Sequence, residues 1–169
     1  MQSPAGPEAF PVGIDTAPLI ELNALLVDDD PDARELISEM LRRHQVLVTC
    51  ASSADEALVM LQQARPDILL SDIAMPGKDG FDLIRTLRQL NASDGGSLPA
   101  IALTAYARSE DRQKILSAGF DAHVPKPVET GYLLGEILRV TSAARASPGE
   151  FRANGKPQPE TTQVALKAD

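Results

Sequence analysis

Short apolar runs alternate with amphipathic segments along the middle of this chain. Five of the runs are too short for helices and predict buried strands at residues 24–27, 46–50, 67–71, 100–103 and 122–125. After each run, apolar residues recur at helical spacing, which predicts helices at residues 31–43, between Ser53 and Pro66, and at residues 80–90, 109–117 and 129–141. This alternation favours an α/β fold with one doubly wound, five-stranded parallel sheet.

Several residues mark where the predicted helices begin and end. Asp30 followed by Pro31 suits an N-cap and a first helical turn, and residues 53–56 match a capping box. Gly119 is expected to close the fourth helix. The inner face of the first helix is predicted to hold Ala33, Leu36, Ile37, Met40 and Leu41.

The ends of the 169-residue chain lack this periodicity. Residues 1–21 are rich in proline and read as a linker or tail, and residues 143–169 are polar and too short for a second folded domain. Both segments are expected to be disordered. One folded domain is predicted at residues 22–142.

Composition narrows the classes of partner. With 24 acidic and 16 basic side chains the net charge is −8, which argues against nucleic acid as a ligand and for cationic partners such as metal ions. Cys50 is the only cysteine, so no disulfide forms within the chain, which fits a reducing cytoplasm. No apolar run reaches the roughly 18 residues of a membrane span, so the expectation is a soluble, cytoplasmic protein without membrane contact.

Reactive side chains follow four of the five predicted strands. Asp28 and Asp29 follow the first strand and Asp72 the third, while Thr104 and Lys126 follow the fourth and fifth. The carboxyl ends of parallel strands open on one edge of a sheet, so these groups are expected to meet there. Three carboxylates in one place repel one another unless a cation neutralises them, and oxygen ligands suit Mg²⁺ or Mn²⁺.

This grouping suits phosphoryl transfer. With a metal bound and Lys126 opposite, Asp72 can act as a nucleophile toward phosphorus, and Thr104 can hydrogen-bond the new phosphoryl group. Each residue taken singly also has a plainer interpretation. Asp72 can be a turn cap, Thr104 a strand-end hydroxyl and Lys126 a solvated surface lysine.

The sequence around these residues resembles the receiver domain of two-component response regulators. The resemblance covers about residues 22–140 and rests on four motifs: Val27-Asp28-Asp29; Ser71-Asp72 with Met75-Pro76-Gly77-Lys78-Asp79-Gly80; Leu103-Thr104-Ala105; and Val124-Pro125-Lys126-Pro127. It implies a flavodoxin-like three-layer sandwich in which Asp72 is the phosphoacceptor for a histidine kinase or histidine phosphotransfer domain.

The same resemblance assigns roles to the other residues. Asp28, Asp29, Asp72 and the backbone carbonyl of Ala74 would hold Mg²⁺, with Asp28 acting largely through water. Lys126 would contact the phosphoryl oxygens beside a cis bond to Pro127, and Thr104 would be the switch hydroxyl. The sequence of residues 103–108 and 119–128 is most similar to C-terminal receivers of hybrid histidine kinases. A free-standing receiver is the alternative.

Two features depart from the best-known receiver pattern. His123 occupies the switch position that usually holds Tyr or Phe, and it is either a switch side chain or a partly exposed histidine at a strand edge. Ala74 and Tyr106 lie two residues beyond Asp72 and Thr104, and Ala74 has no side chain to position an attacking water. Slow self-dephosphorylation is therefore expected.

Two other functions fit the predicted fold less well. A phosphatase resembling the haloacid dehalogenases needs a second Asp two residues after the nucleophile, where this chain has Ala74. A flavodoxin-like cofactor carrier needs a loop of Gly, Ser and Thr after the first strand, which is acidic here. The favoured interpretation is a phosphorylation-controlled interaction module, not a turnover enzyme, that acts on an unknown downstream protein; without a DNA-binding helix pair after Thr141, a direct transcription role is not expected.

Overall fold

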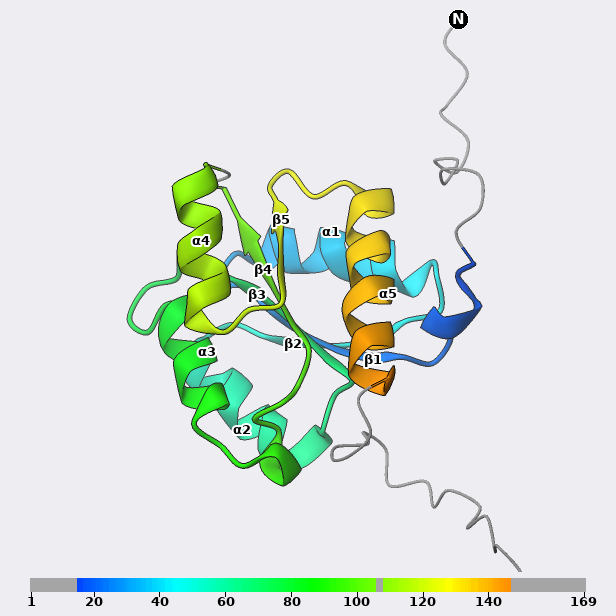
Figure 1. Cartoon of the computed structure of the whole chain (residues 1–169). Helices are drawn as coiled ribbons and strands as arrows, with labels where there is room; N and C mark the ends of the chain where they lie inside the picture. Colours follow the sequence, from blue (N-terminus) through cyan, green and yellow to red (C-terminus); the bar gives the residue numbers. More distant parts are fainter. Residues whose placement is uncertain (1–14, 106–107, 147–169) are drawn as a thin grey trace, which may run out of the picture.

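The computed structural model describes residues 15–105 and 108–146, and these residues form a five-stranded parallel sheet with helices on both faces (Figure 1). The strands, in the order β2-β1-β3-β4-β5, are β1 (Asn23–Val27), β2 (Leu47–Ala51), β3 (Ile68–Asp72), β4 (Ala100–Thr104) and β5 (Ala122–Pro125). The helices are α1 (Pro31–Arg42), α2 (Ala54–Ala64), α3 (Gly80–Arg88), α4 (Ser109–Ala118) and α5 (Thr130–Ala146). Short 3₁₀ turns lie at Ala17–Leu19 and Ala92–Asp94. The predicted flavodoxin-like α/β fold is confirmed.

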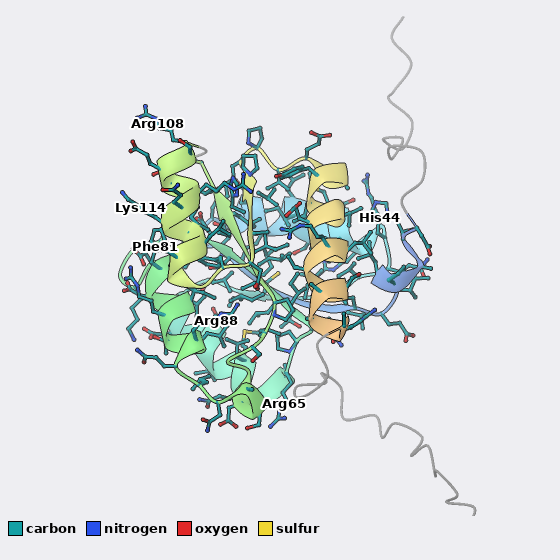
Figure 2. The ribbon with its side chains drawn as sticks, in the orientation of Figure 1. His44, Arg65, Phe81, Arg88, Arg108 and Lys114 are labelled. Atoms are coloured by element: carbon teal, nitrogen blue, oxygen red, sulfur yellow. The ribbon has the colours of Figure 1, made fainter. Side chains whose placement is uncertain are left out.

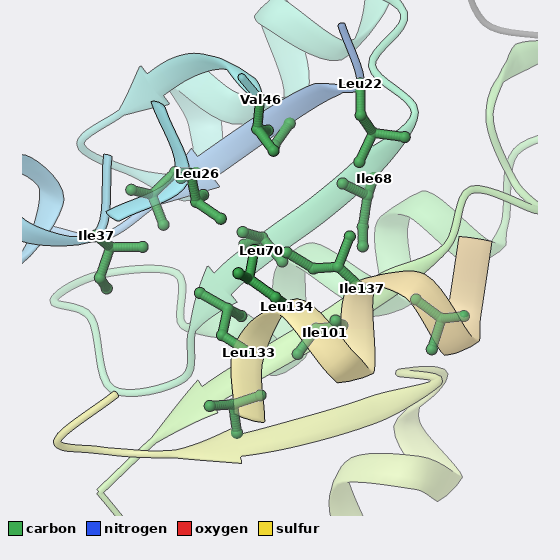
Figure 3. Packing of buried hydrophobic residues seen from close by; sticks show 14 of the residues in the cluster. Leu22, Leu26, Ile37, Val46, Ile68, Leu70, Ile101, Leu133, Leu134 and Ile137 are labelled. Carbon is green, nitrogen blue, oxygen red and sulfur yellow. The ribbon is translucent and has the colours of Figure 1, made fainter. Parts of the chain in front are cut away.

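Two hydrophobic clusters hold the three layers together, one on each face of the sheet. Because successive strand residues point to opposite faces, Leu26 of β1 joins the cluster under α1 and α5, whereas Leu25 joins the cluster under α2, α3 and α4. Figure 3 shows the first cluster, in which Leu133 and Ile137 of α5 pack toward Leu70 of β3. The central strands are buried on both faces, which explains their unbroken apolar runs.

The helix caps agree with the sequence in part. The Asp30 carboxylate accepts a hydrogen bond from the backbone N–H of Asp32 at 3.0 Å, so Asp30 is the N-cap of α1. Ser53 caps α2 by accepting from the backbone N–H of Glu56. The Glu56 carboxylate, however, accepts from the backbone and hydroxyl of Ser52, one residue earlier than a capping box requires.

The inner face of α1 is a correction to the sequence prediction. Leu36 was expected to face the core, but it is 59% exposed, whereas Ile37 and Leu41 are buried. The buried stripe instead takes in Ser38, whose hydroxyl lies 3.1 Å from the Cys50 sulfur on β2. A polar side chain with a local partner can occupy an inner position, and apolar spacing alone does not reveal this.

The boundaries of the folded part differ from the expected 22–142 at both ends. Leu19, placed in the predicted linker, is fully buried in the cluster under α1 and α5, and it belongs to the 3₁₀ turn at Ala17–Leu19. The α5 helix continues to Ala146, beyond the expected end of the domain. Residues 1–14 and 147–169 lie outside the described residues, so the expectation for those tails stays a prediction.

Candidate functional site

The carboxyl ends of four adjacent strands bring the singled-out side chains to one edge of the sheet. In the parallel register Val27 of β1 pairs with Ser71 of β3, so Asp28 and Asp72 follow on neighbouring strands. Asp72 pairs with Leu103 of β4, and Thr104 pairs with Pro125 of β5. Thr104 is therefore the last residue of the strand beside Asp72, and Lys126 follows one strand further on.

Three carboxylates form the centre of this site. Asp28, Asp29 and Asp72 each offer one oxygen, and these oxygens lie within 4.8 Å of one another. Asp28 is fully buried and Asp72 is 6% exposed, while Asp29 is open to solvent. A set of carboxylate oxygens with one open side fits a hard divalent cation that keeps part of its water shell, as Mg²⁺ does.

Lys126 contacts both buried carboxylates. Its ammonium nitrogen lies 2.8 Å from Asp28 Oδ2 and 3.4 Å from Asp72 Oδ1. Partial burial by itself lowers the pKa of Lys126, but the hydrogen bond from its ammonium to Asp28 and the charges of both carboxylates bring it above the ordinary value. Lys126 therefore stays positively charged at neutral pH.

The Asp72 carboxyl carries an electrostatic cost in the folded protein. Burial raises the pKa of Asp72 above its usual range because it disfavours the charged form. The charge of Lys126 opposes this rise, and the neighbouring charge of Asp28 adds to it. A cation beside these carboxylates would offset both the cost of burying the Asp72 charge and its repulsion by Asp28.

Backbone contacts fix the orientation of Asp28 and Lys126. Asp28 Oδ1 accepts a hydrogen bond from the backbone N–H of Asp30 at 2.9 Å, which leaves Oδ2 for Lys126. The Arg34 guanidinium on α1 donates to the backbone carbonyl of Asp28 at 2.6 Å. The backbone N–H of Lys126 donates to the carbonyl of Thr104, and the Lys126–Pro127 bond is cis, as the resemblance implies.

The loop after Asp72 folds tightly back on the strand end. The backbone N–H of Gly80 donates to the carbonyl of Ile73 at 2.8 Å. A Cβ at Gly80 would fall 2.8 Å from the Ile73 Cα and still closer to the carbonyl oxygen of Asp72, so only glycine fits there. Ala74 is exposed in this loop. Sequence reasoning quoted Gly80 within a motif but missed this close approach, as it missed Arg34.

The two remaining positions differ in their surroundings. Thr104 is almost fully buried at the end of β4. His123 is half-buried on β5, where burial and then the charge of Arg112 on α4 lower its pKa, against the opposing charge of Glu136 on α5. His123 is not part of the acidic group. Tyr106, the other position of interest, lies outside the described residues.

Comparison with known proteins decides the family. The family description "Response regulator receiver domain" matches residues 24–138 of this chain. The chain belongs to the receiver domain family. Receivers are the response-regulator components of two-component signalling.

Individual relatives agree with this assignment. The receiver is 50% identical over 111 residues to an uncharacterized 14.6 kDa protein of Leptolyngbya boryana, which covers 66% of this chain and 83% of the relative. It is 31% identical over 135 residues to the sensor histidine kinase GacS of Pseudomonas protegens, covering 79% of this chain. That match spans only 15% of GacS, so it concerns a single domain of a much longer kinase.

Solved structures share the fold. The chemotaxis protein CheY4 of Vibrio cholerae superposes with a TM-score of 0.66 at 30% identity, covering 71% of this chain and 98% of that one. The receiver domain of a sensor histidine kinase from Pseudomonas aeruginosa gives a TM-score of 0.66 at 31% identity, covering 72% and 98%. The latter structure has a magnesium ion coordinated in its active-site cleft.

Within the described residues of the present receiver, no helix has the length and apolar character needed to span a membrane.

Proposed function

We propose that Asp72 accepts a phosphoryl group from the phosphohistidine of a histidine kinase or histidine phosphotransfer domain, and that this phosphorylation switches a protein-binding surface. The observation that carries the proposal is the Lys126 ammonium, which contacts the Asp28 and Asp72 carboxylates at the centre of the acidic group. A lone turn-capping aspartate or a solvated lysine would not require this arrangement.

The proposed reaction forms one bond and breaks one. A carboxylate oxygen of Asp72 attacks phosphorus, the phosphorus–nitrogen bond of the donor breaks, and its electron pair stays on the departing imidazole nitrogen. Lys126 contacts a phosphoryl oxygen and exchanges part of its interaction with Asp72 for it, while Asp28 keeps the ammonium in place at 2.8 Å. Thr104, at the end of the next strand, offers a hydroxyl to the product and thereby senses phosphorylation.

Asp28, Asp29, Asp72 and the exposed backbone carbonyl of Ala74 would hold the metal, which we infer to be Mg²⁺ with Mn²⁺ as a substitute. The bound ion supplies neutralisation of charge on the transferring group. The donor set of clustered carboxylate oxygens supports this inference, and so does the magnesium in the related P. aeruginosa receiver.

The site is proposed to transfer phosphate once per switching cycle and not to turn over small phosphomonoesters. Hydrolysis by an aspartate nucleophile needs a nearby general acid, and Ala74, two residues after Asp72, provides none. His123, between the charges of Arg112 and Glu136, is the proposed switch side chain on β5. The downstream target is proposed to be a protein and not nucleic acid, because the net charge is −8, and the place of action is proposed to be the cytoplasm.

Incubation with acetyl phosphate and Mg²⁺, followed by intact-mass measurement, tests this function. The wild-type chain is expected to gain one phosphoryl group, and Asp72→Asn none. Asp94→Asn, which changes an exposed acid outside the site, serves as the matched control and is expected to behave like the wild type. Equal phosphorylation of Asp72→Asn would overturn the proposal.

A further inference from the structure

A groove between α3 and α4 lies outside the acidic site. Its volume is about 330 Å³, and it is lined by Phe81, Arg85, Lys114, Ser117 and Ala118. Phe81 and Ala118 are half-buried and form an apolar floor that continues into the cluster under these helices. Arg85, Lys114 and Ser117 are exposed. Figure 2 shows Lys114 of α4 and Phe81 of α3 next to each other along the outer edge of the molecule.

The two cations of the groove are available for a ligand. The guanidinium carbon of Arg85 lies 5.7 Å from the centre of the Phe81 ring, a cation–π contact that restrains the side chain without using its N–H groups. Among the described residues, no acidic oxygen lies within the 4.0 Å salt-bridge distance of Arg85 or Lys114. Glu110 and Asp111 lie one turn before Lys114 on α4, but their carboxylates are also farther than 4.0 Å from its ammonium.

Two other basic side chains near the groove are already paired. Arg88, on the same helix as Arg85, bonds the backbone carbonyls of Gly119, Gly96 and Leu98 as well as Asp121. Lys78, in the loop before α3, pairs with Asp55. Among the described residues, Arg85 and Lys114 are therefore positive charges without a carboxylate at salt-bridge distance, on a chain whose net charge is −8; Arg112 of α4 is another, but it does not line the groove.

From this arrangement, we propose that the α3–α4 groove binds an acidic peptide segment of a partner protein. Carboxylates of the segment pair with Arg85 and Lys114, an apolar side chain rests on Phe81 and Ala118, and the Ser117 hydroxyl donates to the segment. A carboxylate partner is favoured by charge, because the groove places two cations without carboxylate partners beside an apolar floor. The proposal does not depend on the phosphoacceptor chemistry of Asp72.

The size and charge of the groove also favour a peptide over a small-molecule ligand or a nucleic acid. About 330 Å³ is at the lower end of the volumes of small-molecule sites, and three of its five lining residues are exposed, which suits one or two peptide side chains better than an enclosed ligand. Two cations are too few for the phosphate contacts of a nucleic acid, and the strong net negative charge opposes that partner.

The groove is also placed to respond to the acidic site. The α3 helix follows the loop that begins at Asp72, and α4 follows the end of β4 at Thr104. The two walls of the groove are thus the elements that follow, in the chain, the strand ends with the proposed phosphoacceptor and switch hydroxyl.

The test follows amide NMR signals of the full-length, unphosphorylated chain without divalent cations. The probe is a synthetic peptide in which glutamates alternate with leucines, and its matched analogue carries glutamine in place of every glutamate. The acidic peptide is expected to shift signals of Phe81, Arg85, Lys114, Ser117 and Ala118. The glutamine analogue is expected to bind at least about tenfold more weakly, since it loses the charge pairs with Arg85 and Lys114.

Charge-reversal variants provide the second arm. The pair Arg85→Glu and Lys114→Glu is expected to reduce affinity for the acidic peptide at least about tenfold. Arg112→Glu, a single charge reversal on the α4 face near His123, is expected to leave the affinity within about twofold. An unchanged spectrum outside the substituted helices shows that each variant is folded.

Several results would overturn the proposal. They are absence of shifts at the groove, equal affinity for the glutamine analogue, or groove shifts produced by ATP or duplex DNA but not by the acidic peptide. A concentration-dependent doubling of mass that shifts the same signals would assign the groove to a second copy of the chain instead. Asp72→Asn is expected to bind the peptide normally, so failure of the phosphoacceptor chemistry and failure of this proposal are distinguishable.

Discussion

At the scale of single residues, the buried Asp72 carboxylate lowers the free energy of unfolding at neutral pH. Asp72 is nearly buried, lies beside the buried Asp28 and has a pKa above its ordinary value. The folded state therefore binds a proton at Asp72 more tightly than the unfolded state does. By linkage, the free energy of unfolding falls as pH rises from the unfolded pKa, about 4, through the folded pKa of this group.

Asp72→Asn should remove this cost. In EDTA at neutral pH the variant is expected to have a higher free energy of unfolding than the wild type, because no carboxylate charge is buried at position 72. The difference should shrink as pH falls through the folded pKa of Asp72 toward the unfolded value, and below about 4 it should be lost because the wild-type carboxyl is protonated in both states. Urea unfolding across a pH series measures this, and a neutral-pH variant that is less stable than the wild type would contradict the account.

Asp29 offers the cleanest probe of metal binding, because it is exposed while its neighbours in the group are buried. Mg²⁺ at ten times its dissociation constant is expected to raise the free energy of unfolding of the wild type by about 1.4 kcal/mol. Asp29→Asn should change the metal-free stability by no more than about 0.5 kcal/mol but lose most of that gain.

The control for this experiment is Asp32→Asn, an exposed acid in the first turn of α1 that is not part of the group. It should keep the full magnesium-induced gain, and EDTA should abolish the gain in every chain. A wild-type-sized gain in Asp29→Asn would show that the ion is held elsewhere.

At the scale of elements, the junction between β3 and α3 depends on Gly80. Gly80→Ala is expected to lower the free energy of unfolding by about 1–3 kcal/mol, because the new Cβ overlaps the backbone at Asp72 and Ile73. Gly135→Ala on α5 is the matched control. Apart from its chain neighbours and the backbone of its own helix, no atom lies within 4 Å of its Cβ position, so this change is expected to be neutral or to stabilise by up to about 1 kcal/mol. Thermal unfolding compares the two, and equal stability of both variants would contradict the close approach.

Element types and caps were predictable from local signals. Asp30 before Pro31 and Ser53 before α2 satisfy backbone N–H groups within their own first turns, so a short window of sequence contains the whole interaction. The direction of the α1 inner face was not predictable in the same way. Leu36 is exposed, whereas Ser38 is buried with its hydroxyl 3.1 Å from the Cys50 sulfur on β2, a contact that sequence spacing cannot show.

At the scale of the whole molecule, the parallel sheet explains why part of the site could be predicted. All strands of such a sheet end on one edge, so Asp28, Asp72 and Lys126 had to converge once the strands were located. The order of the strands and the reach of each side chain come only from packing. The sequence therefore did not reveal that Lys126 contacts both buried carboxylates, or that Arg34 holds the backbone of Asp28.

The α3–α4 groove belongs to the same scale. Phe81 and Lys114 are far apart in the sequence, and no local pattern marks them as neighbours. Their proximity results from two helices packed side by side on one face of the sheet. A surface of this kind could be recognised only in the folded receiver.

The most direct test of the central claim is to locate the phosphoryl group on the intact receiver. Borohydride reduces an acyl phosphate on aspartate to homoserine, so the chain is phosphorylated with acetyl phosphate and Mg²⁺, reduced, digested and sequenced by mass spectrometry. The account predicts homoserine at position 72 and unmodified Asp28 and Asp29. Homoserine at another carboxylate, or none under conditions that label a known receiver, would contradict it.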